Sequence, residues 1–344
     1  MKYLRYSSVL IAILLLPVVL GQDFPLAQDD PVILNAIEFI ADHQTPDGGF
    51  GQYGEGDLST TFRACEAIVA AGGDPLSYEV GGVGIDDFFL SVSEGVYNGS
   101  YGTNPLAEKI NMVMGLVACG LDPRDFGGHD FVADLMSMQN QTTKSFGSGS
   151  SDTAYSILAL LAAGVSAGDP AIQGAGGYLV DSQLMDGTFE YSTGWGADSN
   201  THSIAVITLS QLGSSGDTWN NAVGAIPSFM NGTNRGLYYQ AMWGTSPDVS
   251  STSYGIQAIL AASMNPVGSP YAVGGEDPVK YLLSTQNSTT GEFFDPWGSL
   301  KPTTLAVTAL VGEVTPGINI VEVPLASLMC LGVSIGIRRF GNDR

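Results

Sequence analysis

Residues 44–73 carry the hydrophobic pattern that recurs along the chain: a glycine-rich turn, then a mostly apolar segment that ends at glycine. The Asp-Gly-Gly step predicts a sharp turn, because glycine adopts positive φ without steric cost. The hydroxyls of residues 59–61 are suited to cap the first free amides of a helix. Residues 64–71 are apolar on nearly every face except at Glu66, so we expect this helix to be buried on most sides.

The same pattern recurs six times, with a spacing of about 44 to 50 residues. The apolar helices are expected to end at Gly72, Gly120, Gly164, Gly213, Ser263 and Gly312. A second helix is expected before each of them, over residues 32–43, 85–92, 130–138, 172–182, 223–230 and 278–285. One pair of amphipathic helices cannot hide its own apolar face, but six stacked pairs that close on themselves can.

Several turns share the pattern Gln-x-x-Asp-Gly-x-Phe: QTPDGGFG from Gln44 fits best, QLMDGTFEY from Gln183 well, and QNSTTGEFF from Gln286 loosely. Followed by a capped apolar helix, this pattern resembles the repeat of the terpene cyclase and protein prenyltransferase superfamily. The resemblance covers residues 31–312. It implies an all-α fold, an α6/α6 toroid of six helix hairpins, with six inner helices around a central cavity and six outer helices. A fold does not identify a chemistry.

Charge narrows the range of partners. The chain has 12 Lys and Arg against 34 Asp and Glu, a formal net charge of −22. Binding to nucleic acid needs a basic surface, so we exclude nucleic acid as a partner. Only 13% of residues are charged and 45 are glycine, which fits buried helices joined by glycine-rich turns and not a disordered chain.

Both ends of the chain indicate export. Residues 1–21 resemble a secretory signal peptide, and residues 22–30 form a short linker. After a second linker over residues 313–322, residues 323–344 form an apolar tail that ends in arginines and resembles the sorting tails of prokaryotic surface proteins. We expect an exported, cell-surface protein held at the cell envelope by this tail. The alternatives are an uncleaved N-terminal anchor and a last helix of the core.

The three cysteines do not form a metal-binding motif. Cys65 and Cys119 lie in apolar helical segments, and Cys330 lies in the C-terminal tail. Without a CxxC pair, neither a zinc knuckle nor a disulfide scaffold is indicated. A bridge between Cys65 and Cys119 is one alternative in an exported protein, and the pattern favours two separate buried thiols.

In such a toroid the N-termini of the inner helices meet at one mouth of the cavity, where free amides and partial positive charge collect. A class II terpene cyclase is expected to carry an Asp-x-Asp-Asp acid there. The nearest match is SGSSDTAYS, in which Asp152 stands alone and is the first catalytic candidate, with helix capping as the alternative. Protein prenyltransferases resemble this chain in fold but use zinc ligands that are missing here, so no metal and no cofactor is predicted.

The other candidates form a polar and aromatic mouth. Asp198 and His202, four positions apart, are a candidate acid–base pair. Aromatic walls with a few polar groups suit a small-molecule or sugar site. The candidate ligand-binding residues are Arg63, Tyr155, Trp195, Asn200, Trp243 and Tyr254, of which Arg63, Tyr155 and Tyr254 occupy the same repeat position. The alternative is that the aromatic residues fill the toroid and the polar ones cap helices.

Three functions remain open at this point. The first is an exported toroid that binds a small-molecule, lipid or glycan ligand in its cavity, without the catalytic motifs of its superfamily. The second is a toroid enzyme, related to the cyclases or acting as a lyase or hydrolase, that uses Asp152 or the Asp198–His202 pair. The third is a structural surface module that contacts other envelope proteins through its outer face.

Overall fold

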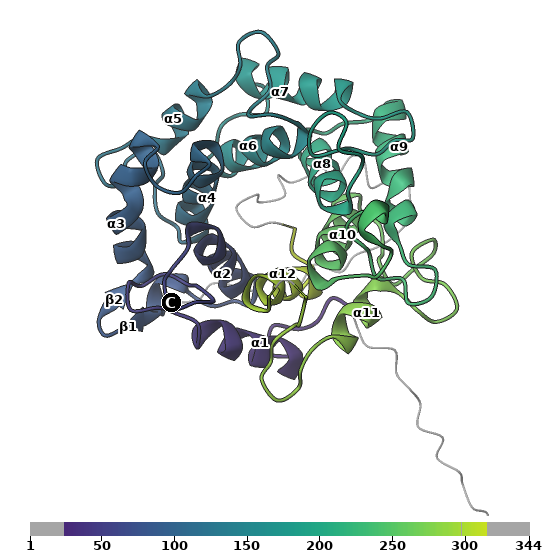
Figure 1. Ribbon diagram of the computed structural model, residues 1–344, viewed down its shortest axis with the longest axis horizontal. Helices are drawn as coiled ribbons and strands as arrows, with labels where there is room; N and C mark the ends of the chain where they lie inside the picture. The colour runs from purple at the N-terminus through teal and green to yellow at the C-terminus, as the bar shows by residue number, and fades with distance from the viewer. Residues whose placement is uncertain (1–23, 297, 315–344) are drawn as a thin grey trace, which may run out of the picture.

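The computed structural model describes residues 24–296 and 298–314, whose α-helices form two concentric rings (Figure 1). The inner ring consists of α2 (Leu58–Ala70), α4 (Pro105–Ala118), α6 (Ser150–Ala162), α8 (Ser199–Gln211), α10 (Val249–Ala261) and α12 (Leu300–Leu310). The outer ring consists of α1 (Pro31–Ala41), α3 (Ile85–Asn98), α5 (Phe131–Ser137), α7 (Pro170–Asp181), α9 (Gly216–Ala225) and α11 (Pro278–Ser284). The predicted all-α, α6/α6 toroid is therefore confirmed.

Short elements complete the connections between the helices. Three 3-10 helices, η1 (Pro75–Ser77), η2 (Ile226–Phe229) and η3 (Ala241–Trp243), lie in the connecting segments. The strands β1 (Glu79–Val80) and β2 (Val83–Gly84) pair in antiparallel fashion just before α3. Each inner helix packs against its two inner neighbours, and α12 packs against α2, so the ring is closed. The inner helices are accordingly buried on almost every face.

A glutamine at the end of four outer helices joins each turn to the next repeat. The Nε2 amide of Gln183 donates to the carbonyl of Gly187 in its own turn (3.0 Å) and to the carbonyl of Thr218 in α9 (2.9 Å). Gln44 and Gln139 make the same pair of hydrogen bonds, each to its own turn and to the start of the following repeat. The glutamine of the recurring motif is therefore a bridge between repeats.

The last repeat is joined to the first by the same bond. Gln286 Nε2 donates to the carbonyl of Val32 in α1 (2.8 Å) and to that of Gly291 in its own turn (3.1 Å). Gly291 has a φ of +80°, and a Cβ there would lie 2.0 Å from the carbonyl oxygen of Asn35. Only glycine fits this approach, because a side chain would strain the backbone and clash with α1.

The predicted ends of the inner helices are confirmed, but two other predictions are corrected. All six predicted end residues have positive φ, including Ser263 at +57°. The cap of α2 is Asp57, which accepts from the amide of Thr60, and not a hydroxyl of residues 59–61. The helix expected at residues 223–230 is instead α9 followed by η2, because Pro227 cannot continue an α-helix.

The segments expected to direct export lie outside the described residues. These are the signal peptide over residues 1–21 and the tail over residues 323–344, with most of the linker before the tail. Across residues 24–296 and 298–314, no helix combines the length and the apolar character that crossing a membrane requires. The expected anchoring therefore stays a prediction.

We expect Gln286→Ala to lower the free energy of unfolding by about 1 to 3 kcal/mol, because it removes the hydrogen bond to Val32 that closes the ring and the bond to Gly291 that holds the turn. Urea unfolding followed by circular dichroism measures this loss. Gln173→Ala, on the exposed face of α7, is the matched control and should change stability by less than about 0.5 kcal/mol. Equal stabilities for the two variants would contradict the closing role of Gln286.

Candidate functional site

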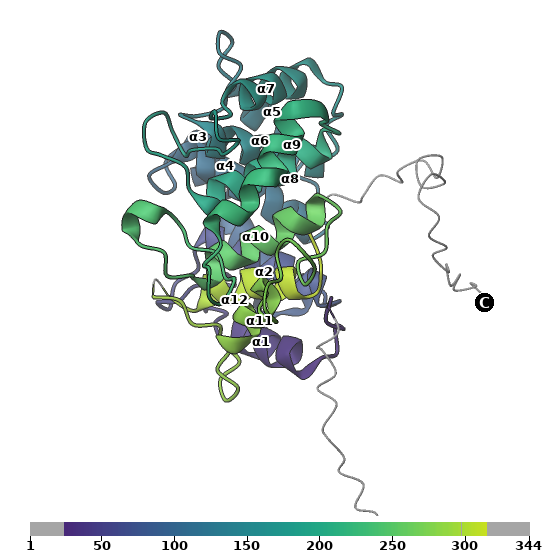
Figure 2. The same cartoon turned by 90° about the vertical axis from the view of Figure 1, so that its right-hand side faces the viewer.

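The loops that lead into the inner helices gather on one face of the ring, at the left in Figure 2. On this face Asp57, Asn104, Asp198 and Asp248 cap their helices by accepting from a backbone amide in the first turn. The parallel inner helices bring the positive ends of their dipoles to the same face. We call this face the mouth.

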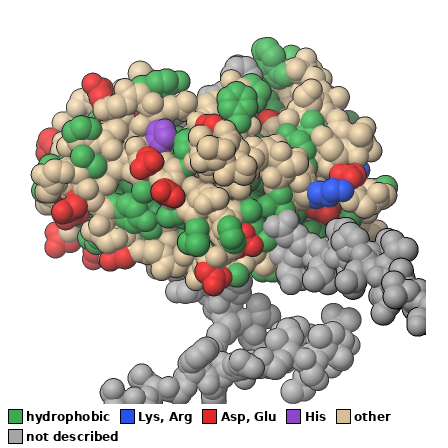
Figure 3. All heavy atoms as spheres, turned by 90° about the horizontal axis from the view of Figure 1, so that it is seen from below, with side chains coloured by type: hydrophobic (Ala, Val, Ile, Leu, Met, Phe, Trp, Pro, Cys, Tyr) green, Lys and Arg blue, Asp and Glu red, His purple; other side chains and the backbone are tan. Residues whose placement is uncertain are grey.

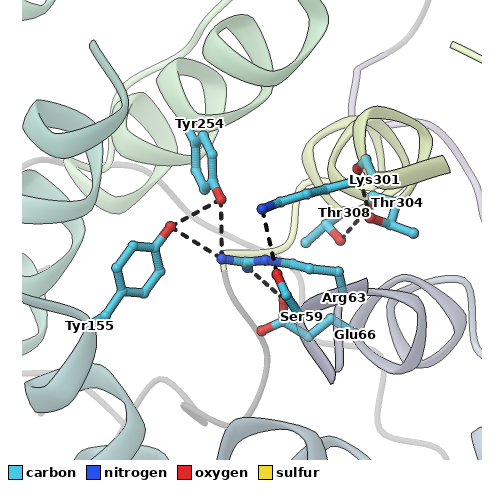
Figure 4. A network of polar contacts seen from close by, with 8 residues as sticks. All are labelled: Ser59, Arg63, Glu66, Tyr155, Tyr254, Lys301, Thr304 and Thr308. Atoms are coloured by element: carbon cyan, nitrogen blue, oxygen red, sulfur yellow. Dashed lines mark hydrogen bonds and ion pairs between the residues drawn. The ribbon is translucent and has the colours of Figure 1, made fainter. Parts of the chain in front are cut away.

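Three predicted ligand-binding residues meet at the centre of the ring (Figure 4). Arg63 of α2 donates through its NH2 nitrogen to the hydroxyls of Tyr155 of α6 (3.2 Å) and Tyr254 of α10 (3.1 Å). The Tyr155 hydroxyl donates to that of Tyr254 at 2.9 Å. α2, α6 and α10 are every second helix of the inner ring, so the three side chains reach its centre from three sides. We call Arg63, Tyr155, Tyr254 and the adjacent Glu66 the central cluster.

Burial decides the protonation behaviour of the central cluster. Arg63 forms an ion pair with Glu66 at 2.7 Å, and both side chains are almost fully buried. Burial raises the pKa of Glu66 to about 7, although Arg63 opposes the shift. Burial lowers the pKa of Arg63, but Tyr254, Glu66 and Tyr155 more than offset this effect, so its pKa lies above the usual value. Burial and the neighbouring Tyr254 also raise the pKa of Tyr155.

The central cluster is not saturated by its protein partners. The Nε of Arg63 and the Oε1 of Glu66 are buried and make no hydrogen bond within the part of the chain that the structure describes. An unpaired buried polar atom is costly, so both atoms are suited to a water molecule or a polar ligand group. Lys301 of α12 is exposed and lies nearer the mouth than Arg63 does. Its Nζ is 3.5 Å from the Oγ of Ser59, in the first turn of α2 (Figure 4).

Two neighbouring loops of the mouth expose large aromatic side chains. Trp195 and Trp243 are 68% and 77% exposed, which is unusual for the largest apolar side chain. Gln240 Nε2 donates to the carbonyl of Trp195 (2.9 Å), and Ser199 donates its amide to the carbonyl of Tyr239 (2.8 Å). These bonds join the loop before α8 to the loop before α10. We call the exposed set on the two loops the aromatic rim: Tyr191, Trp195, Tyr239, Met242 and Trp243.

Asp152 stabilises the start of α6. Its Oδ2 accepts from the amide of Ser148 at 3.0 Å and from the hydroxyl of Ser148 at 3.4 Å. Gly149, the N-cap residue, has no side chain, so no side chain caps the first amides of α6. The Asp152 carboxylate therefore holds the turn that precedes α6 and does not bond a first-turn amide of the helix. A catalytic role for Asp152 stays a prediction.

Asp198 and His202 face different surroundings. The Asp198 side chain caps α8 by accepting from the amide of Thr201 at 2.8 Å, and burial raises its pKa. The His202 ring packs between Phe189 and Phe229, with centroids at 6.0 and 5.3 Å. The structure does not bring the two side chains together as a hydrogen-bonded pair. Asn200 is half-buried at the mouth, and its side-chain Oδ1 accepts from the hydroxyl of Ser199.

The position of His202 explains its burial. In four other repeats the same position is a threonine whose hydroxyl accepts from the amide of the buried turn residue: Thr61, Thr153, Thr252 and Thr303. His202 thus replaces a residue that holds the turn on the helix. Burial lowers its pKa to about 4, and the backbone of Ala222 and the charge of Asp186 offset only part of this shift.

Some site residues were missed from the sequence. Glu66 was noticed only as a polar interruption of an apolar helix, although its spacing of three from Arg63 places the two on one helix face. Tyr191 gave no signal, because its ring contact with Trp195 and its proximity to Tyr239 of the loop before α10 arise only in the folded chain. No group of three or more His, Cys, Asp or Glu residues is placed to hold a metal ion within residues 24–296 and 298–314.

The toroid is shared with enzymes of known structure. It superimposes on a type II terpene cyclase from Scytonema, MstE, with a TM-score of 0.56 and 14% identity, covering 85% of this chain and 100% of the cyclase. It also superimposes on protein geranylgeranyltransferase-I of Candida albicans, with a TM-score of 0.54 and 9% identity, covering 81% and 90% of the two chains. No protein-family model and no curated protein matches the sequence.

The chain has the α/α toroid fold that this terpene cyclase and this protein prenyltransferase also have. The resemblance predicted from the repeats is therefore confirmed at the level of the fold. Identities of 9 and 14% carry the fold alone, so the chemistry must be argued from the site.

We expect His202→Thr to weaken the pH dependence of stability. Because the folded pKa of about 4 lies below the unfolded value near 6.5, stability is lost as pH falls from about 6.5 toward 4. For one such group the loss at pH 5 is on the order of 2 kcal/mol. Urea unfolding at pH 8 and pH 5 should show a drop smaller by about this amount in the variant. An identical drop in both proteins would show that His202 is not a buried neutral imidazole.

Proposed function

We propose that this chain is an exported, envelope-associated toroid that binds a neutral glycan at its mouth, without the cyclisation or prenyl-transfer chemistry of its superfamily. The aromatic rim carries this proposal. Two tryptophans and two tyrosines project from hydrogen-bonded loops beside the inner-helix N-termini. Exposed rings of this kind offer flat apolar surfaces for the C–H faces of sugar rings, and nearby polar groups supply orientation.

The central cluster supports binding at the mouth and not deep inside the ring. A prenyl chain folded in the toroid needs an apolar chamber, and such sites are lined mainly by apolar side chains. Here an ion pair and two tyrosine hydroxyls occupy the middle of the ring. An isoprenoid beside them would leave the unpaired Arg63 Nε and Glu66 Oε1 against an apolar chain, which is costly.

Charge favours a neutral ligand. Acidic side chains are scattered over the side of the ring shown in Figure 3, among a majority of uncharged ones, and basic side chains are few. The net charge of −22 repels anions over long distances at low salt. Prenyl diphosphates and acidic lipids are therefore disfavoured, whereas an uncharged glycan approaches without this penalty.

Binding measurements on the secreted protein test the proposal. We expect glycan-array binding, confirmed by calorimetry, to fall about tenfold or more in Trp195→Ala and in Trp243→Ala, since exposed aromatic anchors dominate such contacts. Leu34→Ala, which removes an exposed apolar side chain from the outer ring, is the control and should bind as the parent protein does.

A prenyl-type ligand is the competing outcome. A variant of the Scytonema cyclase has been crystallised with its substrate, geranylgeranyl dihydroxybenzoate. Binding of that compound to this chain in place of glycans, unaffected by the two tryptophan substitutions, would overturn the proposal. Retention of glycan binding in both tryptophan variants would overturn the role of the aromatic rim.

Export is a separate expectation. We expect the mature protein to begin at Gln22 and to be found with the cell envelope, because residues 1–21 have the layout of a signal peptide. Sequencing the N-terminus of the native protein and fractionating the cells measure both points. Deletion of residues 323–344 should release the protein into the medium. A chain that retains Met1 and stays in the cell interior would contradict this expectation.

A further inference from the structure

Two thiols from neighbouring inner helices lie in contact inside the ring wall. Cys65 is in the second half of α2, and Cys119 is the C-cap residue of α4. Their sulfur atoms are 3.1 Å apart, the Cys119 thiol donating to Cys65, and both residues are buried. From the sequence, two separate buried thiols were favoured. The structure buries both but does not separate them.

We propose that Cys65 and Cys119 are a redox pair that forms a disulfide between the first two inner helices in an oxidising compartment. A disulfide requires an S–S distance of about 2.05 Å, so the two sulfur atoms need to approach by only about an ångström. The helices that carry them already pack side by side. The two cysteines are 54 positions apart in sequence, so it is the packing of α2 against α4 that brings their sulfur atoms together.

The reaction is a thiol–disulfide exchange with a small-molecule disulfide as oxidant. One cysteine thiolate attacks a sulfur of the oxidant and releases one small thiol, which leaves a mixed disulfide on the protein. The second cysteine then attacks the protein sulfur of that mixed disulfide and releases the second small thiol. The two protein thiols are oxidised, the oxidant is reduced, and the two protons end on the released thiols.

Burial determines when the bond forms. Burial, together with the neighbouring Cys119, raises the pKa of the Cys65 thiol well above its usual value. The thiolate is the reactive form, so the folded pair exchanges slowly. We infer that the bond forms during folding, before α2 and α4 close over the sulfur atoms, and that it then resists reduction. This inference does not depend on the proposed glycan site.

Peptide mapping of the full chain tests the proposal directly. The protein is refolded with oxidised and reduced glutathione, its remaining thiols are blocked, and it is digested without reductant. We expect one linked peptide that contains Cys65 and Cys119, lighter by two hydrogen atoms than its separate halves, in the parent and in Cys330→Ser. Blocked, unlinked Cys65 and Cys119, or a link from either to Cys330, would overturn the proposal.

Thermal unfolding provides a second readout. Reduction of the bond in the unfolded protein, followed by refolding in dithiothreitol, should lower Tm by about 5 to 10 °C, because the bond restricts a long loop of the unfolded chain. Cys119→Ala should unfold at the same temperature with and without reductant. If reduction does not change the Tm of the parent protein, the proposal is overturned, even if Cys119→Ala fails to fold.

Discussion

Ring closure is the constraint on which the rest of the molecule depends. No helix hairpin of this chain can bury its own apolar face, so each needs a neighbour on both sides. The first and last repeats find that neighbour in one another, through the packing of α12 on α2 and the bond from Gln286 to Val32. The mouth and the centre exist only because the ring closes.

Closure also sets what the interior holds. Side chains that point inward from alternate inner helices reach one another across the centre. In this chain three of those side chains are Arg63, Tyr155 and Tyr254, and they bond to each other. Polar side chains that bond to one another thus occupy the centre of the ring. The large exposed aromatic side chains lie at the aromatic rim and not in the centre.

The central cluster and the aromatic rim lie in different parts of the ring. The central cluster and the adjoining pair of Cys65 and Cys119 hold the inner ring together at its first, third and fifth helices and between its first and second. The loops before α8 and α10 carry the aromatic rim. Hydrogen bonds between these two segments hold them side by side, and the rim side chains are exposed. Loops on a rigid scaffold are the usual place for binding residues.

The sequence by itself determined the repeat and its length, because periodic apolar helices and glycine-rich turns are local signals. The toroid followed from the resemblance of this repeat to that of a known superfamily. It also placed Arg63, Tyr155 and Tyr254 at one repeat position, which predicted their common level in the ring. Only the tertiary structure decided that they bond to one another, that Cys65 touches Cys119, and that His202 is separated from Asp198. The first two are contacts between helices far apart in sequence, and their distances depend on how the whole ring packs. The His202 ring instead packs between Phe189 and Phe229, which other segments bring to it.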